Sequence, residues 1–535
     1  MRVFTKRTSA FFAALAIGGV SLAFAGVYNS AQGQRWWGYV KYLASDELQG
    51  RETGSEGHRK AAAYVADQFQ QDGLKPAGTD GYIQPVPFIV IKVDQERSKA
   101  ALVEHGKATP LISGEDVLFS SRCEWPRPVN APMVFIGYGI SAPSAAYDDL
   151  KGVDLKGKIA VILSGAGPSN VSGNLRAHAS HERWQFLKAA GALGVVSIAN
   201  PALMDIPWSR MRNNASQPGM LLEEPALQDT AGEQVALAVN PEKAEKFFAG
   251  SGHTFAEILA AGQKGEALPH FPLPASLKVE AAVSKSNVVS QNIAGILPGR
   301  DPALESQYVV MTAHVDHLGV GNPIHGDAIF NGAMDNASGV ASLLEIAKEA
   351  KESGNRPKRS ILFVVVTGEE KGLLGSKYFA AHPTVPEHSM IADINIDMFL
   401  PIVPLHVLTV YGLGESTLGA TVRKIAEEHG LEVQDDPQPS RNVFIRSDQY
   451  NFILHGIPSV ACKVGAKPGS KEEKQETEWL HSRYHAPSDD VNQPVDLGAA
   501  ALFNQIMMQS AWAVADTQQR PTWRQDSFFR RFAVE

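Results

Sequence analysis

The stretch Ile361–Ser376 reads ILFVVVTGEEKGLLGS and sets the organisation of the chain. Its first six residues are apolar and mostly β-branched, a pattern typical of a strand buried on both faces of a parallel or mixed sheet. A Thr-Gly pair ends the run, and Glu369 and Glu370 follow at once. Ligands of open α/β sheets gather beyond the carboxyl ends of the strands. The two glutamates are therefore either a solvated loop or part of a chemical site, and the other acidic and histidine residues must decide between them.

The composition indicates a globular protein of more than one domain. The chain has 535 residues, of which 44% are hydrophobic and 20% charged, and two or three domains are expected at this length. The net charge is −8 and no long basic run occurs, which argues against nucleic-acid binding. Cys123 and Cys462 are too few for a cysteine-based metal site, and we expect both to be unpaired.

Residues 1–25 have the features of a signal peptide. Basic residues precede an apolar stretch, Ala10–Phe24, whose end carries the small residues of a cleavage site. We expect cleavage before Gly26 and export to the periplasm or the medium, with no membrane contact afterwards. The alternative is an uncleaved anchor, because the apolar stretch approaches the roughly 20 residues that a membrane span needs.

The rest of the chain has two regions with different sequence patterns. From about Ser290, apolar strands such as Tyr308–Ala313 alternate with helical patterns such as Ala337–Ser353, which predicts an α/β fold: a doubly wound, mixed but mostly parallel sheet with helices on both faces. Between 96 and 285, short β-like runs alternate with turns and few helices. We therefore predict one discontinuous α/β domain, 26–95 and 286–515, an inserted β-rich domain at 96–285, and a C-terminal tail at 516–535. His178 and His181 of the insert are expected on the surface.

Histidine and carboxylate residues recur where the predicted strands end. This set contains no thiolate and suits one or two divalent ions, zinc first. A two-metal hydrolase needs a bridging carboxylate, a further carboxylate and one histidine for each ion, and a free carboxylate as base. Taken singly, Asp335 could be a helix N-cap and His314 a core residue. Together they predict a metal site built from His314, Asp316, His317, Asp335, Glu369, Glu370, Asp397, His481, His485 and Asp489.

The motifs HVDH, NGAMDNASG, TGEEKGLLGS, NIDM and YHAPSDD, in this order, resemble those of the co-catalytic di-zinc aminopeptidases. Relatives of that family include bacterial leucyl aminopeptidases and glutamate carboxypeptidase II. Leu43–Phe69 resembles the entry segment of the family, and Phe135–Leu163 resembles the protease-associated domain inserted in many members. The resemblance implies a zinc exopeptidase fold with two Zn²⁺ per chain, acting on peptides.

The resemblance also implies the metal ligands. One ion would be bound by His314 and Asp397, the other by Glu370 and His485, and Asp335 would bridge the two. In relatives the peptide bond that follows the bridging aspartate is cis.

The resemblance also implies residues that take part in the reaction or orient the metal ligands. Glu369 would be the general base, taking a proton from a metal-bridging water and passing it to the leaving amine. Asp316 would orient His314, and Asp489 would orient His485. Tyr484 occupies the position from which some relatives stabilise the tetrahedral oxyanion.

These features favour an exported aminopeptidase over three alternatives. A glutaminyl cyclase uses one zinc ion, whereas this chain retains every ligand for two. A glutamate-specific carboxypeptidase stays open because Arg441 and Arg446 lie in a loop near the expected pocket, beside the Ser447-Asp448 pair. A catalytically dead binding protein is disfavoured by the intact Glu369 and the complete ligand set.

Overall fold

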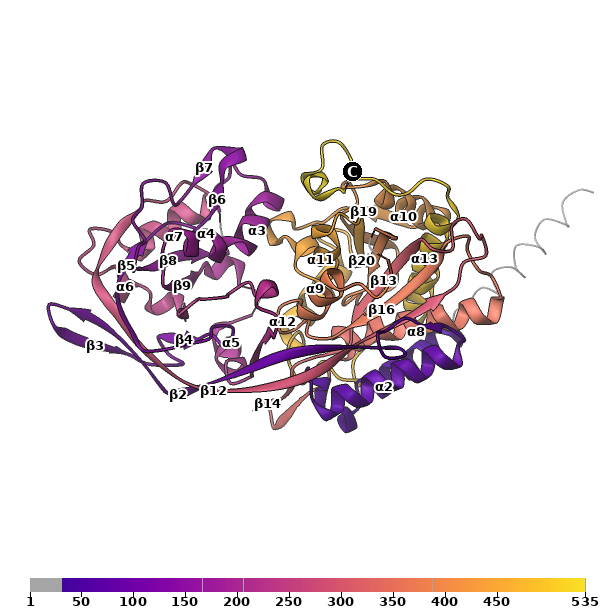
Figure 1. Cartoon of the computed structure of the whole chain (residues 1–535), viewed down its shortest axis with the longest axis horizontal. Coiled ribbons are helices and arrows are strands. Elements are labelled where there is room, and N and C mark those ends of the chain that lie inside the picture. The colour runs from indigo at the N-terminus through magenta and orange to yellow at the C-terminus, as the bar shows by residue number, and fades with distance from the viewer. Residues whose placement is uncertain (1–30, 166, 205, 387, 535) are drawn as a thin grey trace, which may run out of the picture.

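The computed structural model describes residues 31–165, 167–204, 206–386 and 388–534, so the expected signal peptide lies outside the described residues. The described chain forms two lobes that lie side by side (Figure 1). Two long strands, β2 (Ile83–Glu104) and β12 (Phe271–Leu297), run from one lobe into the other and pair antiparallel, with one register shift between Glu280 and Ala282.

The larger lobe is built on a mixed sheet of order β19-β18-β20-β17-β13-β16-β12. Its four central strands, β20, β17, β13 and β16, are parallel. At the sides of this group, β18 runs antiparallel to β20 and parallel to β19, and β12 runs antiparallel to β16. This is the mixed, mostly parallel sheet predicted from the sequence. The strands other than β12 span β13 Tyr308–His314, β16 Ser360–Val366, β17 Met390–Asn395, β18 Val407–Tyr411, β19 Glu432–Gln434 and β20 Ser459–Gly465.

Strand β16 shows why helices cover both faces of this sheet. All seven of its residues are buried, and successive side chains point to opposite faces. Ile361, Phe363 and Val365 pack into one core, and Leu362 and Val364 pack into another. The first core is closed by α2 (Glu56–Gln71), α8 (Ser338–Ser353), α10 (Thr417–Glu428) and α13 (Leu497–Asp516), and the second by α9 (Leu374–Ala381) and α11 (Gln449–Leu454).

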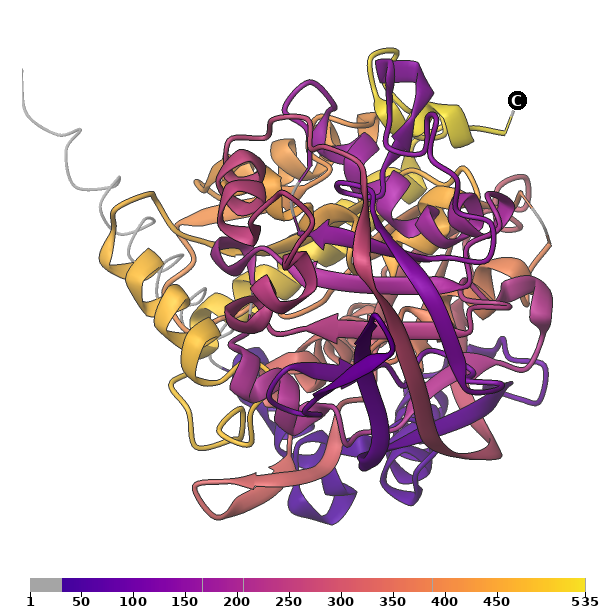
Figure 2. The same cartoon turned by 90° about the vertical axis from the view of Figure 1, so that its left-hand side faces the viewer.

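The smaller lobe continues the same sheet in the order β12-β5-β8-β9-β11-β4. Figure 2 looks onto this lobe from its outer end. Four of its strands, β5, β8, β9 and β11, are parallel, and short helices accompany them. Its elements include β4 Val117–Phe119, β5 Val129–Phe135, β8 Ile159–Ser164, β9 Gly194–Ala199, β11 Val235–Val239, α3 Gly173–His181, α4 Arg183–Ala189, α6 Glu245–Phe248 and α7 Phe255–Gln263.

The lobe is therefore less purely β than the sequence suggested, because its helices are too short to give a clear helical period. Strands β2 and β12 extend past positions 96 and 285, and the register shift of their pairing leaves residues 95–98 of β2 unpaired, next to the predicted boundary at 96. Their two ends contribute to different cores: Ile293 and Leu297 of β12 pack in the larger lobe, and Leu102 of β2 and Leu277 of β12 pack in the smaller one.

The two lobes touch through His178, which the sequence had led us to expect on the surface. Its Nδ1 lies 2.7 Å from the Tyr450 hydroxyl, and its ring packs against Phe528 and Phe532 of the C-terminal segment. The expectation was wrong for His178 because a polar sequence neighbourhood does not reveal a partner lobe. His181, by contrast, is exposed.

Cys123 and Cys462 are both buried and unpaired, as expected. Over the described ranges, the helices are either too short or too polar to cross a membrane.

Candidate metal centre

The candidate residues meet at the carboxyl edge of the parallel strands. His314 is the last residue of β13, Glu369 and Glu370 follow β16, and Asp397 follows β17. Since β16, β13 and β17 are parallel neighbours, their carboxyl ends share one edge of the sheet. The remaining two residues come from η6 (Ala333–Ala337), the turn before α8, which carries Asp335, and from the loop after α12 (Lys471–Ser482), which carries His485.

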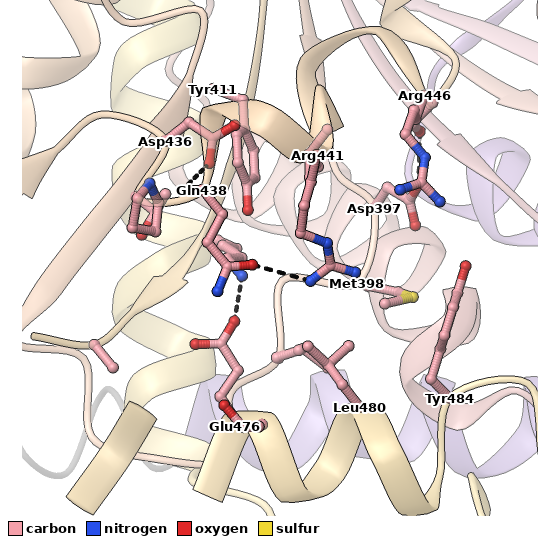
Figure 3. A pocket seen from close by; sticks show the side chains of 18 of the residues that line it. Asp397, Met398, Tyr411, Asp436, Gln438, Arg441, Arg446, Glu476, Leu480 and Tyr484 are labelled. Atoms are coloured by element: carbon pink, nitrogen blue, oxygen red, sulfur yellow. Dashed lines mark hydrogen bonds and ion pairs between the residues drawn. The ribbon is translucent and has the colours of Figure 1, made fainter. Parts of the chain in front are cut away.

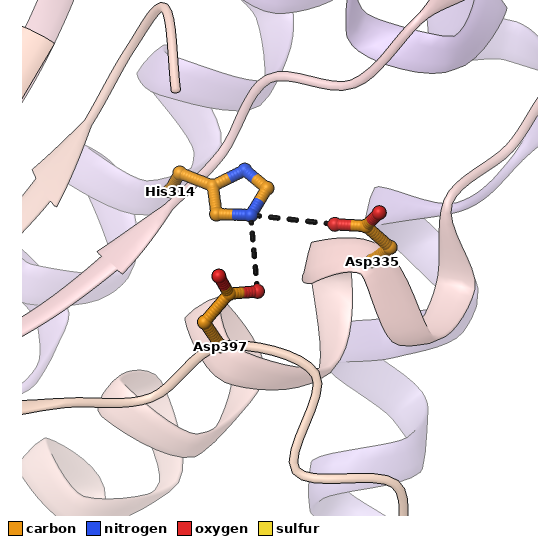
Figure 4. A group of neighbouring side chains, drawn as sticks. All are labelled: His314, Asp335 and Asp397. Atoms are coloured by element: carbon orange, nitrogen blue, oxygen red, sulfur yellow. Dashed lines mark hydrogen bonds and ion pairs between the residues drawn. The ribbon is translucent and has the colours of Figure 1, made fainter. Parts of the chain in front are cut away.

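Two groups of donor atoms form around Asp335. Nε2 of His314 lies 3.3 Å from Oδ1 of Asp335 and 3.3 Å from Oδ1 of Asp397 (Figure 4). Nε2 of His485 lies 3.3 Å from Oδ2 of Asp335 and 3.2 Å from Oε2 of Glu370. Asp335 thus turns one carboxylate oxygen to each histidine. Two donors bound about 2.0–2.1 Å from a tetrahedral zinc ion lie about 3.3 Å apart, so both groups fit the ion in spacing and in donor chemistry.

The carboxylates and imidazoles of this cluster shift one another's pKa values. Burial and the Glu370 charge act to raise its pKa, but hydrogen bonds with His314 and His485 hold the pKa of Asp335 at about 2. Burial alone would lower the pKa of His314, but the charges of Glu369 and Asp397 raise it well above its ordinary value. A divalent cation would take over the role of the imidazole protons, because it offers the same carboxylates a positive charge.

The pKa values of the two adjacent glutamates, Glu369 and Glu370, are shifted in opposite directions. Burial raises the pKa of Glu369 well above its ordinary value, and the charges of Asp397 and Glu370 raise it further. Burial acts in the same direction on Glu370, but His485 and His317 hold its pKa well below the ordinary range. A pair of carboxyl groups whose pKa values are pushed apart is the arrangement found where one group binds and the other exchanges protons.

Asp316 contacts different atoms from those expected. Its backbone carbonyl, not its carboxylate, accepts the hydrogen bond from Nδ1 of His314 at 3.1 Å. The carboxylate Oδ1 instead accepts from the backbone amide of Glu369 at 3.2 Å, and Oδ2 accepts from the Thr53 hydroxyl at 2.8 Å. The side chain therefore holds the loop that carries Glu369, while its Oδ1 lies 3.9 Å from Nδ1 of His314, beyond hydrogen-bond distance.

Asp489 also differs from expectation. Its carboxylate accepts hydrogen bonds from the backbone amides of Met334 and Asp335 and from Nε2 of Gln493. Within the described residues it makes no hydrogen bond with His485. Asp489 therefore fixes the backbone of the candidate bridging residue. The peptide bond between Asp335 and Asn336 is cis, as the resemblance implied.

Tyr484 packs its ring against that of His485, with centroids 4.0 Å apart. Burial, together with the charges of Asp335 and Glu370, raises the pKa of Tyr484 well above its ordinary value, so that the phenol keeps its proton. Figure 3 shows its side chain beside Met398, with the hydroxyl turned to the side where Arg446 and Asp397 lie. A protonated phenol at this place can donate a hydrogen bond into the site.

Two cavities open onto the cluster and share Glu369, Tyr484 and His485 in their walls. One, of about 190 Å³, extends within the larger lobe past Met398 and Leu480 toward a polar end (Figure 3). Residues of that polar end include Tyr411, Asp436, Gln438, Arg441, Lys463 and Glu476. The other, of about 440 Å³, lies between the lobes. Arg446 also lines both cavities, so each cavity contacts this arginine and the candidate metal-binding residues.

Sequence reasoning missed Arg122 of the smaller lobe, which lines the cavity between the lobes. Its Nη2 donates to the backbone carbonyl of Glu370 at 3.3 Å, and a Cβ placed on Gly372 would lie 3.2 Å from Nη1. No carboxylate of the described chain lies within 4.0 Å of this guanidinium. Only the fold could reveal it, because 248 positions separate Arg122 from Glu370.

His317 was placed in the predicted metal site by the sequence but received no individual role there. It is fully buried, and its Nδ1 lies 2.7 Å from Oε1 of Glu370. His317, Asp335 and Glu370 bring their donor atoms within 4.8 Å of one another, as His314, Asp335 and Asp397 do. The signal was present in the motif HVDH, which carries two histidines three positions apart.

Comparison with known proteins agrees with this geometry. Residues 292–511 match peptidase family M28. Over 222 residues the chain is 28% identical to the probable leucine aminopeptidase 2 of Aspergillus oryzae, an alignment that covers 39% of this chain and 41% of the relative. Over 257 residues it is 28% identical to aminopeptidase YwaD of Bacillus subtilis, covering 46% of this chain and 50% of that protein. The chain thus spans half or less of the length of these curated relatives.

Among solved structures, the aminopeptidase from Aneurinibacillus sp. strain AM-1 is similar over 90% of this chain and 93% of its own, with a TM-score of 0.52 and 18% identity. At that identity the similarity concerns the fold, which extends over both lobes. The fold and the strand-end cluster define an α/β protein with a candidate site for divalent metal ions. The match to peptidase family M28 covers residues 292–511, which include every candidate metal ligand.

Proposed function

We propose that this protein is an exported zinc-dependent exopeptidase, most simply an aminopeptidase that removes N-terminal residues from peptides. The observation that carries this proposal is the position of Asp335: one of its carboxylate oxygens lies 3.3 Å from His314 and the other lies 3.3 Å from His485. In this proposal one Zn²⁺ is held by His314 and Asp397 and a second by Glu370 and His485, with Asp335 shared. The family match and the aminopeptidases among the relatives support the same activity.

The bound ions would supply Lewis-acid activation of water and of the scissile carbonyl. Glu369 accepts the proton of the attacking water and returns it to the leaving amine, a role suited to a carboxylate whose pKa is raised by burial. Asp316 holds the main chain of Glu369 in place. Tyr484 donates a hydrogen bond to the oxygen that develops negative charge.

The lobe that contains 96–285 is proposed to be an inserted protease-associated domain, with 26–95 and 286–515 as the discontinuous catalytic domain and 516–535 as a tail. Its contribution of Arg122 to the cavity between the lobes supports a role in substrate binding. The signal-peptide-like residues 1–25 support export.

A carboxypeptidase is the second candidate, and a specific observation favours it. Arg122 and Arg446 both line the cavity between the lobes, where they could receive a substrate carboxylate. Aminoacyl and acyl-blocked chromogenic substrates, compared with and without a chelator, separate the candidates. An aminopeptidase cleaves the free aminoacyl substrates and loses activity with the chelator. Cleavage of blocked substrates alone, or activity that survives chelation, would overturn the aminopeptidase proposal.

The substitution Glu369→Gln tests the proposed proton transfer. It keeps the shape of the side chain but removes the base, so the variant should retain its zinc and lose turnover by about 10²–10⁴-fold. Zinc content is measured by elemental analysis in parallel with the rate. A variant with full zinc and unchanged turnover would show that Glu369 is not the base.

A further inference from the structure

His317 is the third imidazole at the candidate metal centre and has no part in the mechanism described above. Its Nδ1 lies 2.7 Å from Oε1 of Glu370 and 3.9 Å from Oδ2 of Asp335. Two roles are compatible with these distances. His317 could bind the second ion directly, or it could hold Glu370 in place for that ion.

The backbone around it fixes the ring. A Cβ placed on Gly332 would lie 2.6 Å from Cγ and Cδ2 of His317, so the ring rests directly on this glycine. The backbone amide of His317 donates to the carbonyl of Arg51 at 3.3 Å. Because the side chain is also fully buried, the direction of each ring nitrogen is set by the fold.

Each carboxylate oxygen of Glu370 lies close to a different histidine. Oε2 lies 3.2 Å from Nε2 of His485, the separation of two donors on one ion, whereas Oε1 lies 2.7 Å from Nδ1 of His317. The shorter distance is that of a strong hydrogen bond to a carboxylate. One oxygen is therefore directed at the ion site and the other at His317.

The second ring nitrogen decides between the two roles. A histidine that binds a metal usually donates its other N–H to an acceptor, as His314 does through Nδ1 to the carbonyl of Asp316 at 3.1 Å. Nε2 of His317 is buried and has no hydrogen-bond partner in the described part of the chain. Direct metal binding through Nδ1 would place the proton on Nε2, where a buried N–H would lack a protein acceptor. With the proton on Nδ1, the N–H has an acceptor, Oε1 of Glu370 at 2.7 Å, so no donor of the ring is left unsatisfied.

We propose that His317 is a positioning residue, neutral and protonated on Nδ1, which donates a hydrogen bond to Oε1 of Glu370 and directs Oε2 to the second zinc ion. The proposal rests on the zinc centre proposed above. It makes the second ion, but not the first, depend on the hydrogen bond from His317, because that bond reaches Glu370, a ligand of the second ion alone.

The first ion has a matching arrangement that supplies a control. The Ser447 hydroxyl donates to Oδ2 of Asp397 at 2.6 Å and leaves Oδ1 facing His314. Ser447→Ala therefore removes one hydrogen bond from a ligand of the first ion, as His317→Ala does for the second. His317→Asn keeps an N–H donor close to the position of Nδ1.

The test is a zinc titration of the metal-free full chain and these three variants against a competing chelator. Anomalous scattering from crystals at limiting free zinc then shows which of the two sites each variant empties. We expect His317→Ala to weaken only the ion beside Glu370, by about 10–100-fold, and Ser447→Ala to weaken only the ion beside Asp397. His317→Asn should stay within about threefold of the wild type, since its donor replaces Nδ1.

The proposal is overturned if His317→Ala holds both ions as tightly as the wild type, or if His317→Asn is as weak as His317→Ala. Should a variant fail to fold, X-ray absorption of the zinc-loaded wild type still decides the question. Two imidazoles for two zinc ions support the positioning role, and three show direct binding and overturn it. A wild type that takes up no zinc overturns the proposed function itself, which separates that failure from a failure of the His317 assignment alone.

Discussion

Oδ2 of Asp489 accepts a hydrogen bond from the backbone amide of Asp335 at 3.0 Å. The candidate bridging residue is thus held through its main chain, which leaves its carboxylate to the histidines. Three N–H donors converge on this buried carboxylate, and each oxygen is occupied as an acceptor. An amide in its place would turn an NH₂ group toward at least one of them.

We therefore expect Asp489→Asn to lower zinc affinity by about 10–100-fold, the usual effect of losing a residue that orients a metal ligand. Asp490→Asn is the matched control, because it removes the same charge one position later, where the carboxylate hydrogen-bonds with Asn492 and not with the metal-site backbone. Zinc affinity is measured by competition with a chelator. Equal affinities for both variants would contradict a role of Asp489 in holding Asp335.

The second prediction concerns Asp316, whose carboxylate Oδ1 accepts a hydrogen bond from the Glu369 amide and lies 3.9 Å from Nδ1 of His314. Asp316→Ala removes the acceptor of the Glu369 amide but leaves the backbone carbonyl that binds His314. The variant should keep its zinc and lose about 10–100-fold in kcat, since the base is no longer held in place. Asp316→Asn can still accept from Glu369 and donate to Thr53, so its loss should be smaller. Loss of zinc in Asp316→Ala would instead support orientation of His314 by the side chain.

The sequence predicted which residues gather at the site, but not all of their contacts. Parallel strands bring His314, Glu370 and Asp397 to one edge, and this follows from hydrophobic patterning alone. The partner of each carboxylate depends on side-chain direction, which is why Asp316 and Asp489 contact backbone amides instead of the expected histidines. Arg122 could not be predicted, because its approach to Glu370 depends on how the second lobe is placed.

Arg122 offers a direct test of the cavity between the lobes. Its guanidinium lines the cavity without a carboxylate partner in the described chain, so a substrate carboxylate could take that position. Arg122→Ala should raise KM about tenfold for peptides with a free C-terminal carboxylate and change KM little for uncharged chromogenic amides. Arg127→Ala removes an exposed arginine of the same loop and serves as the control. An equal rise in KM for both substrate classes would argue against carboxylate binding.

Glu233 lies far from the metal cluster in sequence and makes stability depend on pH. Burial raises the pKa of this carboxyl from 4.5 to about 8. Below pH 4.5 both the folded and the unfolded chain hold the proton, so the group has no effect on stability. Between pH 4.5 and 8 the unfolded chain releases the proton while the folded chain keeps it, so the free energy of unfolding falls as the pH rises. Above the folded pKa the loss is complete.

Glu233→Gln keeps a neutral side chain at every pH and should remove this loss. Relative to the wild type, the variant should gain a few kcal/mol in the free energy of unfolding between pH 4.5 and 8, since each unit of pKa corresponds to about 1.4 kcal/mol. Denaturant unfolding followed across this pH range measures the difference. Glu242→Gln, an exposed position of the same lobe, should show no such trend. A Glu233→Gln difference that does not change with pH would show that the folded chain ionises Glu233 as readily as the unfolded chain does.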